Sequence, residues 1–479
     1  VVNGLELTTG RGHLAGELTF ITSSATNYSS FVDSVHMLGA IEYAAVAAED
    51  IRYFSDAYPQ FPTALVKGRF DGTVNDLYLE DLEIEALSHL EARGDLHLTK
   101  TTSGVNLHLE TQKLYLQGQA EEAKQIIGMF QDSLPEIIDR LGLIQWQGAY
   151  NGGVYDFVTQ SSFKSDLADM ELNIQIGNLR NPQSLIYKGR VDASRINIAA
   201  LTGNFGDFKT AELDLELDGK GFDPLTMRSK VKGAIHHFYY NGYRYQGMAV
   251  NGQIAESNFK GQFRIKDPNL SFLFDGIASF GTDSSEYDFT AQVDSANLYA
   301  LHLVKDSLAQ YRGAMDIDVL ILDQDHWAGT VDLFDLKYRN SSQTYDLMDV
   351  AIEASGLQEE KQLRVRSDIL EANLEGQYTY LGMSRIFSHH FKKYLIPERY
   401  RDTLQSPVNF SYDLTFKNSS ALSQALIPEL LIEPGTHVQG EYRDGENLLR
   451  MNLNSDGIRY GANLFQNLVG GGALACGGL

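Results

Sequence analysis

The chain is poor in cysteine and proline, and it has no long apolar run. Its one cysteine, Cys476, has no partner for an internal disulfide, so cysteine usage says little about the compartment. We find no signal peptide, no lipidation motif and no stretch of about 20 apolar residues. The protein is therefore either soluble or anchored through a segment outside this sequence. Because the start lacks an initiator methionine and the Gly-rich end, residues 470–479, lacks a polar tail, we expect a middle fragment of a longer protein.

Basic residues are scarce relative to acidic ones. The chain has 39 Lys and Arg against 63 Asp and Glu, a formal net charge of −24. This charge argues against nucleic acid as a partner, because phosphates would be repelled. It also argues against electrostatic docking on anionic lipid headgroups. The 25 Tyr and 24 Phe argue against disorder, so we expect a folded protein whose acids form a solvated surface that discourages edge-to-edge aggregation.

Motifs for catalysis, phosphate binding and metal binding are missing. There is no Gly-x-Ser-x-Gly, Walker loop or Gly-x-Gly-x-x-Gly, and Gly470–Gly472 lacks the Lys and Ser/Thr of a phosphate loop. The pairs His236–His237 and His389–His390 are adjacent and lack metal-ligand spacing. Asp316 and Asp318 share one face of a predicted strand, which is most simply a solvated face. The sequence thus predicts no enzyme, no cofactor and no metal site.

What the chain has in abundance is strict alternation of apolar and polar residues. Residues 211–218 place Leu at every second position with an acid between, and the same pattern recurs at 105–109, 171–176, 315–319 and 411–416. A period of two indicates a β-strand with one apolar face and one wet face. Because the pattern returns from end to end, the predicted fold class is mostly β. We expect one elongated, curled antiparallel sheet, with an apolar inner groove and a few short helices.

Turn residues and two breaks in the alternation organise the chain. Pairs such as Asp71–Gly72 and Asn251–Gly252 recur every eight to twelve positions, which is typical of a hairpin meander and not of βαβ units. Helical spacing appears around Pro135 and again before Pro397, and residues 31–57 have an Ala-rich helical character. The expected segments are a β-rich segment at 1–119, a short helical insertion at 120–142, a central β segment at 143–381, a second helical insertion at 382–404, a β-rich segment at 405–469 and the Gly-rich end at 470–479.

The apolar face is the candidate functional site, because few helices are available to cover it. Either the face forms a continuous groove that accepts lipid, or it is a fully packed core; large residues such as Tyr299, Phe334 and Tyr380 leave both open. The residues predicted to line a lipid groove are Leu82, Ile84, Val105, Leu107, Leu109, Leu172, Ile174, Ile176, Leu213, Leu215, Leu217, Leu270, Phe272, Phe274, Met315, Ile317, Val319, Ile321, Tyr412, Leu414 and Phe416.

Several phrases, taken in order, resemble the AsmA-like, TamB-type proteins of Gram-negative bacteria in their Bacteroidetes form. The resemblance spans essentially the whole chain. A strand–Gly-x-Val-x-x-Leu–strand unit and an inter-repeat helix are followed by short Gly-containing strand phrases, ending in Lys-Asp-Pro-Asn-Leu. These phrases are residues 66–77, 119–143, 187–191, 217–221, 243–252, 259–261 and 266–270.

The resemblance implies a periplasmic "β-taco" rod that is anchored in the inner membrane by a helix absent here and reaches the outer membrane. Its function would be bridge-like phospholipid transport between the two membranes, with acyl chains as the bound partner, contributing to outer-membrane biogenesis and integrity. It also implies a link to a BamA-like outer-membrane barrel. The alternative is a structural scaffold with a closed core that assists assembly or secretion of outer-membrane proteins with that barrel.

Overall fold

The structure is a computed structural model. It describes residues 2–10, 12–52, 62–103, 106–128, 139–181, 183–202, 208–221, 223, 225–279, 284–323, 325–380, 408–418, 430–443, 446 and 448–475. Contacts within the chain define two units, Val1–Glu256 (unit 1) and Ser257–Leu479 (unit 2). The boundary falls inside the segment 143–381 that the sequence suggests as one stretch of sheet.

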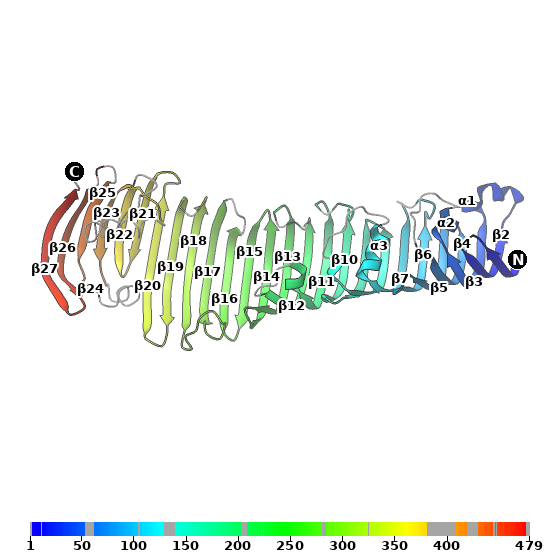
Figure 1. Cartoon of the computed structure of the whole chain (residues 1–479), viewed down its shortest axis with the longest axis horizontal. Helices are drawn as coiled ribbons and strands as arrows, with labels where there is room; N and C mark the ends of the chain where they lie inside the picture. The colour runs from blue at the N-terminus through cyan, green and yellow to red at the C-terminus, as the bar shows by residue number, and fades with distance from the viewer. Residues whose placement is uncertain are drawn as a thin grey trace, which may run out of the picture. The chain divides into compact units, whose positions relative to one another are not determined.

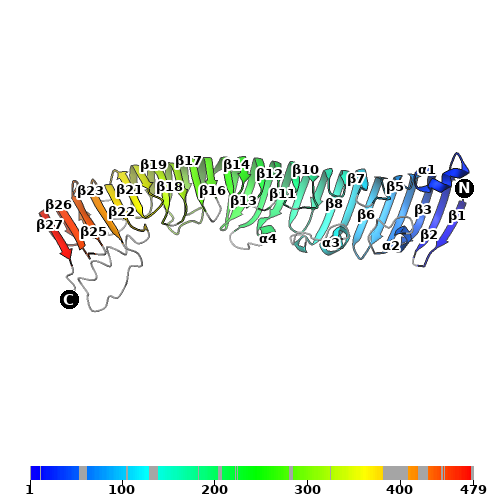
Figure 2. The ribbon, with the colours of Figure 1, turned by 90° about the horizontal axis from the view of Figure 1, so that it is seen from above.

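Unit 1 is built from strands and a few short helices (Figure 1). Its strands are β1 (Val2–Thr8), β2 (His13–Ile21), β3 (His36–Val46), β4 (Ala64–Thr73), β5 (Asp76–Ala86), β6 (Leu90–Thr99), β7 (His108–Gln119), β8 (Leu143–Gly153), β9 (Phe157–Lys164), β10 (Ala168–Gly177), β11 (Ile186–Asn197), β12 (Phe208–Lys220), β13 (Arg228–Tyr240) and β14 (Tyr243–Ala255). Its helices are the 3-10 helix η1 (Ala25–Ser30), α1 (Phe31–Ser34), α2 (Ala48–Arg52), α3 (Ala120–Gly128) and α4 (Ile198–Thr202). Figure 2 shows α2, α3 and α4 on one side of the sheet.

Unit 2 consists of strands alone among its described residues. They are β15 (Asn258–Asp267), β16 (Leu270–Ser279), β17 (Ser285–Asn297), β18 (Gln310–Ile321), β19 (Trp327–Arg339), β20 (Thr344–Ser355), β21 (Glu360–Ser367), β22 (Leu370–Gln377), β23 (Asn409–Phe416), β24 (Leu430–Ile432), β25 (His437–Arg443), β26 (Leu448–Tyr460) and β27 (Asn463–Ala475). Over the described part of the whole chain, no helix has the length and hydropathy needed to cross a bilayer.

Strand order follows chain order, and all pairings are antiparallel. In unit 1 each strand from β1 to β14 pairs with its neighbours in sequence. In unit 2 the same holds from β15 to β23, after which β25 pairs with β23 and β24 pairs with β26. At ~4.8 Å per strand, β1–β14 extend about 65 Å, whereas a 13-residue strand is about 43 Å long. The predicted fold class is thus confirmed: the protein is mostly β, with few helices, and the antiparallel sheet of unit 1 is elongated.

The registers place apolar residues in rows that run across the strands. In unit 1, Leu213 of β12 lies opposite Ala193 of β11 and Ile235 of β13. One such row continues across eleven strands, each residue opposite the next: Val66, Ile84, Ala92, Leu116, Trp146, Phe163, Met170, Ala193, Leu213, Ile235 and Met248. Because side chains alternate between faces, these rows define one apolar face of the sheet.

The helical expectations have mixed outcomes. Helix α3 occupies the start of the predicted insertion 120–142, while residues 129–138 and the whole of 382–404 lie outside the described residues. The helical character expected over residues 31–57 is confirmed for α1 and α2, but residues 36–46 between them form β3. Ala44 is buried and lies opposite Leu14 and Val66. Pairing on both sides outweighs the helix propensity of a short alanine run.

Gly276 of β16 allows a close approach of β17. Its φ is +145°, and a Cβ there would come 2.3 Å from the Asp288 carbonyl oxygen and 2.4 Å from the Phe289 Cα. We expect Gly276→Ala to lower the free energy of unfolding by more than about 1 kcal/mol, because the backbone conformation and the space both disfavour a side chain. Gly470→Ala is the control, since no atom lies within 4 Å of that Cβ. Urea denaturation followed by circular dichroism measures both; equal midpoints would contradict the prediction.

Glu122 ties α3 to the sheet. The buried carboxylate accepts hydrogen bonds from the backbone N–H groups of Ser88, His89 and Gln119, at 3.0, 2.9 and 2.9 Å. Burial raises the pKa of Glu122, but these hydrogen bonds outweigh it and hold the pKa below its usual value.

Since the lowered pKa belongs to the folded state, Glu122 stabilises the fold above its unfolded pKa, and this contribution is lost as pH falls through the folded pKa. We expect the thermal midpoint of Glu122→Gln to fall less on acidification from about pH 6 to about pH 3 than that of the parent protein. The exposed neighbour Glu121 provides the control, and Glu121→Gln should keep the parental pH dependence. If the thermal midpoints of Glu122→Gln and its parent fell by the same amount on acidification, this role would be refuted.

Candidate functional site

Except for Val105 and Leu107, the predicted groove-lining residues share the apolar face within their own units. In unit 2, Ile317 of β18 lies opposite Phe289 of β17 and Val331 of β19. In that unit one row passes through Phe289, Ile317, Val331, Ile352, Val365, Ala372, Leu414, Val438 and Leu453. Most of these side chains are partly exposed, so large parts of the face are not covered.

The apolar face of unit 2 is hollowed over β16–β19. A groove of about 860 Å³ is formed there, and we call it the unit 2 groove. Its lining comprises Phe274, Ala278, Ser285, Tyr287, Phe289, Ile317, Val319, Ile321, Leu322, Asp323, Trp327 and Val331. Four of these, Phe274, Ile317, Val319 and Ile321, are residues that the alternation predicts. Among the described residues the lining is almost wholly apolar, and Asp323 is its one charged group.

Unit 1 has two smaller hollows beside its sheet. One, of about 260 Å³, is lined by β6–β9 residues that include Leu109, Leu116, Trp146, Tyr150 and Phe157. The Tyr150 and Phe157 rings stack with centroids 4.8 Å apart. Burial raises the pKa of Tyr150, so its hydroxyl stays protonated and donates a 2.6 Å hydrogen bond to the Gly153 carbonyl. The other hollow, of about 560 Å³, lies over β1–β3 and has Glu49 and Asp50 among its lining residues.

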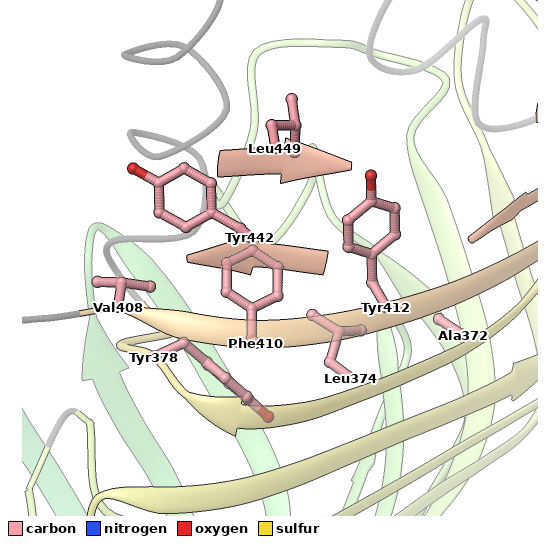
Figure 3. Packing of buried hydrophobic residues seen from close by; sticks show 8 residues of the cluster. All are labelled: Ala372, Leu374, Tyr378, Val408, Phe410, Tyr412, Tyr442 and Leu449. Carbon is pink, nitrogen blue, oxygen red and sulfur yellow. The ribbon is translucent and has the colours of Figure 1, made fainter. Parts of the chain in front are cut away.

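Farther along unit 2 the apolar face is closed by packed side chains. Figure 3 shows this tyrosine cluster, which consists of Ala372, Leu374, Tyr378, Val408, Phe410, Tyr412, Tyr442 and Leu449. The centroid of the Phe410 ring lies 6.1 Å from that of Tyr378 and 5.9 Å from that of Tyr442. Leu414 packs against the edge of the cluster. The same apolar face is therefore an open groove over β16–β19 and a packed core over β22–β26.

The opposite face of the sheet is polar and acidic. In unit 1 the Arg190 guanidinium donates to both carboxylate oxygens of Asp214. The hydrogen bonds from Arg190 hold the pKa of Asp214 below its usual value. In unit 2, Asp288 and Asp318 lie directly opposite each other on neighbouring strands. Like charges so placed are tolerated only because water solvates them, which identifies this face as the wet one.

The remaining predicted residues can be placed individually. Val105 lies outside the described residues, and Leu107 precedes β7 and is not part of a strand. Val319 and Tyr412 are buried, each with 5% of its surface exposed. The following predicted residues occupy strand positions on the apolar face of their unit: Leu82, Ile84, Leu109, Leu172, Ile174, Ile176, Leu213, Leu215, Leu217, Leu270, Phe272, Phe274, Met315, Ile317, Val319, Ile321, Tyr412, Leu414 and Phe416.

Some lining residues were missed by the sequence reasoning. Tyr287, Phe289 and Val331 line the unit 2 groove but are not among the predicted residues. Residues 286–293 nevertheless alternate as strictly as residues 315–319. The signal was present there. Trp327 begins β19 directly after a loop, so no alternation precedes it.

Searches of protein-family models, curated protein sequences and solved structures found no match to this chain. The class of the protein therefore rests on its fold: an antiparallel β protein whose units each present one apolar and one acidic face. Three-residue His, Cys, Asp and Glu groups that could hold a metal are absent from the described part of the chain.

Proposed function

We propose that the apolar face holds the acyl chains of phospholipids, and that the protein is a segment of a periplasmic bridge which carries phospholipids between the inner and outer membranes. The observation that supports this most directly is the unit 2 groove, which is apolar, open and lined by Ile317 and three other residues expected from alternation. In this proposal the full-length protein belongs with the TamB-type family and contributes to outer-membrane biogenesis and integrity. No catalytic step is required.

The apolar face can bind a lipid strongly and still let it move along the strands. Burial of each methylene contributes ~0.8 kcal/mol, so a two-chain lipid is held strongly in total. Along rows of similar residues, such as Phe289, Ile317 and Val331, a sliding chain exchanges one apolar contact for another. The barrier for each step is then small compared with the total binding free energy. While the chains slide along these rows, the headgroup lies at the open rim.

A second candidate is a scaffold for assembly or secretion of outer-membrane proteins, with a BamA-like barrel as partner. The tyrosine cluster favours this candidate, because Phe410, Tyr412 and Tyr442 fill the apolar face there and leave no groove. In a scaffold the wet face would bind the partner, and the apolar face would serve stability alone.

The two tryptophans of the chain allow a direct test, because Trp146 and Trp327 each line a hollow of the apolar face. A phospholipid brominated in its acyl chains quenches indole fluorescence only on contact. We expect quenching of Trp327 in the Trp146→Phe variant and of Trp146 in the Trp327→Phe variant. Mass spectrometry of an organic extract of the purified protein should also detect phospholipid.

The control moves the reporter to the wet face. Asp318→Trp in a variant that lacks both natural tryptophans should not be quenched, since Asp318 is exposed and surrounded by polar residues. Absence of quenching at Trp146 and Trp327 would rule out acyl chains on the apolar face and favour the scaffold. Equal quenching at position 318 would show that the lipid merely adsorbs to the surface.

A further inference from the structure

A buried lysine lies on the apolar face of unit 2 between the groove and the tyrosine cluster. Lys361 of β21 is only 5% exposed. On one side Lys361 lies opposite Gly376 of β22. On the other side it lies next to Gly356, because a Cβ added to Gly356 would come 2.9 Å from the Lys361 Cα. Glycine on both sides leaves room above the strands for the long side chain and for rings that cover it.

The contacts of this ammonium group are aromatic on two sides. Lys361 Nζ lies 5.2 Å from the centre of the Tyr380 ring and 5.9 Å from that of Tyr378. It donates a 2.8 Å hydrogen bond to the Tyr378 carbonyl, its one hydrogen-bond acceptor among the described residues. An ammonium group can donate three hydrogen bonds, so two remain for another acceptor.

The hydroxyl groups of Tyr378 and Tyr380 are buried and interact with each other, and neither has another hydrogen-bond partner within the part of the chain that the structure describes. Tyr378 is 4% exposed. Burial raises the pKa of both phenols, so they remain protonated donors. A buried donor without an acceptor costs free energy. One ammonium and two hydroxyl donors at one place form a set that suits a phosphate oxygen.

This set of donors adjoins the unit 2 groove. The Trp327 ring packs on the Tyr380 ring with centroids 4.9 Å apart, and Trp327 also lines the groove. Asp323, at the groove rim, accepts hydrogen bonds from the backbone N–H groups of Asp325 and His326, which hold its pKa below its usual value. The side chain of His326 pairs with the same carboxylate.

Both Asp323 and Asp325 act electrostatically on Lys361. The end of the groove therefore presents the Lys361 ammonium group, whose pKa burial lowers and these carboxylates raise, beside the carboxylates of Asp323 and Asp325. Carboxylates repel a head that carries only negative charge, whereas they attract an ammonium group.

We propose that this end of the groove binds the zwitterionic phosphoethanolamine head of a phospholipid. The phosphate accepts hydrogen bonds from Lys361 and the two tyrosine hydroxyls, and the ammonium lies beside Asp323. The acyl chains then lie along the groove over Ile317 and Phe289. Tyr380, the more exposed of the two tyrosines, is the side chain that turns to admit the phosphate. This inference rests on the proposed function and adds the headgroup class to it.

The test compares three probes with the same acyl chains: dioctanoyl phosphatidylethanolamine, dioctanoyl phosphatidylglycerol and dioctanoylglycerol. Each displaces a brominated fatty acid from the Trp146→Phe protein, with recovery of Trp327 fluorescence as the readout. We expect phosphatidylethanolamine to bind about tenfold more tightly than the other two, as expected for hydrogen bonds to charged groups. Lys361→Met should weaken binding of both phospholipids, which share the phosphate, and leave dioctanoylglycerol binding unchanged.

Two further variants separate the roles of the charges. Asp323→Asn should strengthen the binding of phosphatidylglycerol relative to that of phosphatidylethanolamine, because the repelling carboxylate is gone. Lys417→Met is the matched control, since Lys417 is exposed and pairs with Glu371, and it should keep the parental preference. Equal binding of all three probes by the parent protein, or an unchanged preference of Lys361→Met for phosphatidylethanolamine over dioctanoylglycerol, would overturn the headgroup site. Failure of the brominated fatty acid and of all three probes to bind would instead overturn the proposed function.

Discussion

Phe410→Ala is expected to lower the free energy of unfolding of unit 2 by about 3–5 kcal/mol, the range found for removal of a buried phenyl ring. Phe410 is 4% exposed and contacts the rings of Tyr378, Tyr412 and Tyr442, so the substitution leaves a cavity that the sheet cannot close. Urea denaturation in the Trp146→Phe background measures this, because the remaining fluorescence then comes from Trp327 in unit 2.

The matched pair for this prediction consists of two aliphatic residues of equal size. Leu374 lies in the tyrosine cluster, whereas Ile317 lies in the unit 2 groove. Leu374→Ala should cost about 2–4 kcal/mol and Ile317→Ala about 1 kcal/mol, because a side chain that already faces an open groove leaves little new cavity. If both variants lost the same stability, the groove would be packed in solution and the lipid proposal would lose its main support.

The second large effect concerns lipid binding. Ile317→Arg should abolish quenching of Trp327 by brominated phospholipid while the β-sheet signal in circular dichroism is retained. The guanidinium would stand in the middle of the groove, where an acyl chain cannot approach it without desolvating a charge. Because the groove is open, water solvates the charge in the lipid-free protein, and the fold survives. In cells that depend on the protein, the proposed function predicts loss of outer-membrane integrity.

The control for this prediction places the same charge one residue away. Asp318→Arg lies on the wet face of β18 and should leave quenching unchanged. The comparison also separates the two candidate functions. A scaffold that binds its partner through the wet face would tolerate Ile317→Arg and be sensitive to Asp318→Arg. That reversed pattern would falsify the lipid path through this section.

Alternation predicts the face of the groove-lining residues that lie in strands. Leu213, Leu215 and Leu217 lie in three parallel rows of the apolar face, as their spacing predicts. The reason is physical: a slip of one residue would bury the acids between them, so the register is fixed by the pattern itself. The turn pairs are a weaker guide. Asn241–Gly242 does join β13 to β14 as a two-residue turn, but the turns predicted at Asp71–Gly72 and Asn251–Gly252 are wrong, since these pairs lie inside β4 and β14.

Alternation does not predict which parts of the apolar face are covered by other side chains. Ile317 and Tyr412 look alike in the sequence, each in an alternating run, yet one lines an open groove and the other is buried. The difference arises because Tyr378 and Tyr442, distant in sequence, pack over the strands at one place. Lys361 was missed for a related reason: a lysine in an alternating strand predicts a solvated position, and only the rings around it make it buried.

The order of pairing has a consequence for how such a protein can change in evolution. Within unit 1 every strand bonds only to its neighbours in sequence, so each hairpin is a local building block. Removing or duplicating one hairpin keeps the strand direction and the face of every other residue, whereas adding a single strand would reverse the direction of all that follow. Length can therefore be adjusted in steps of two strands, about 10 Å each, without redesigning either face. Under the proposed function, the length of such a sheet can be matched to the distance between the two membranes.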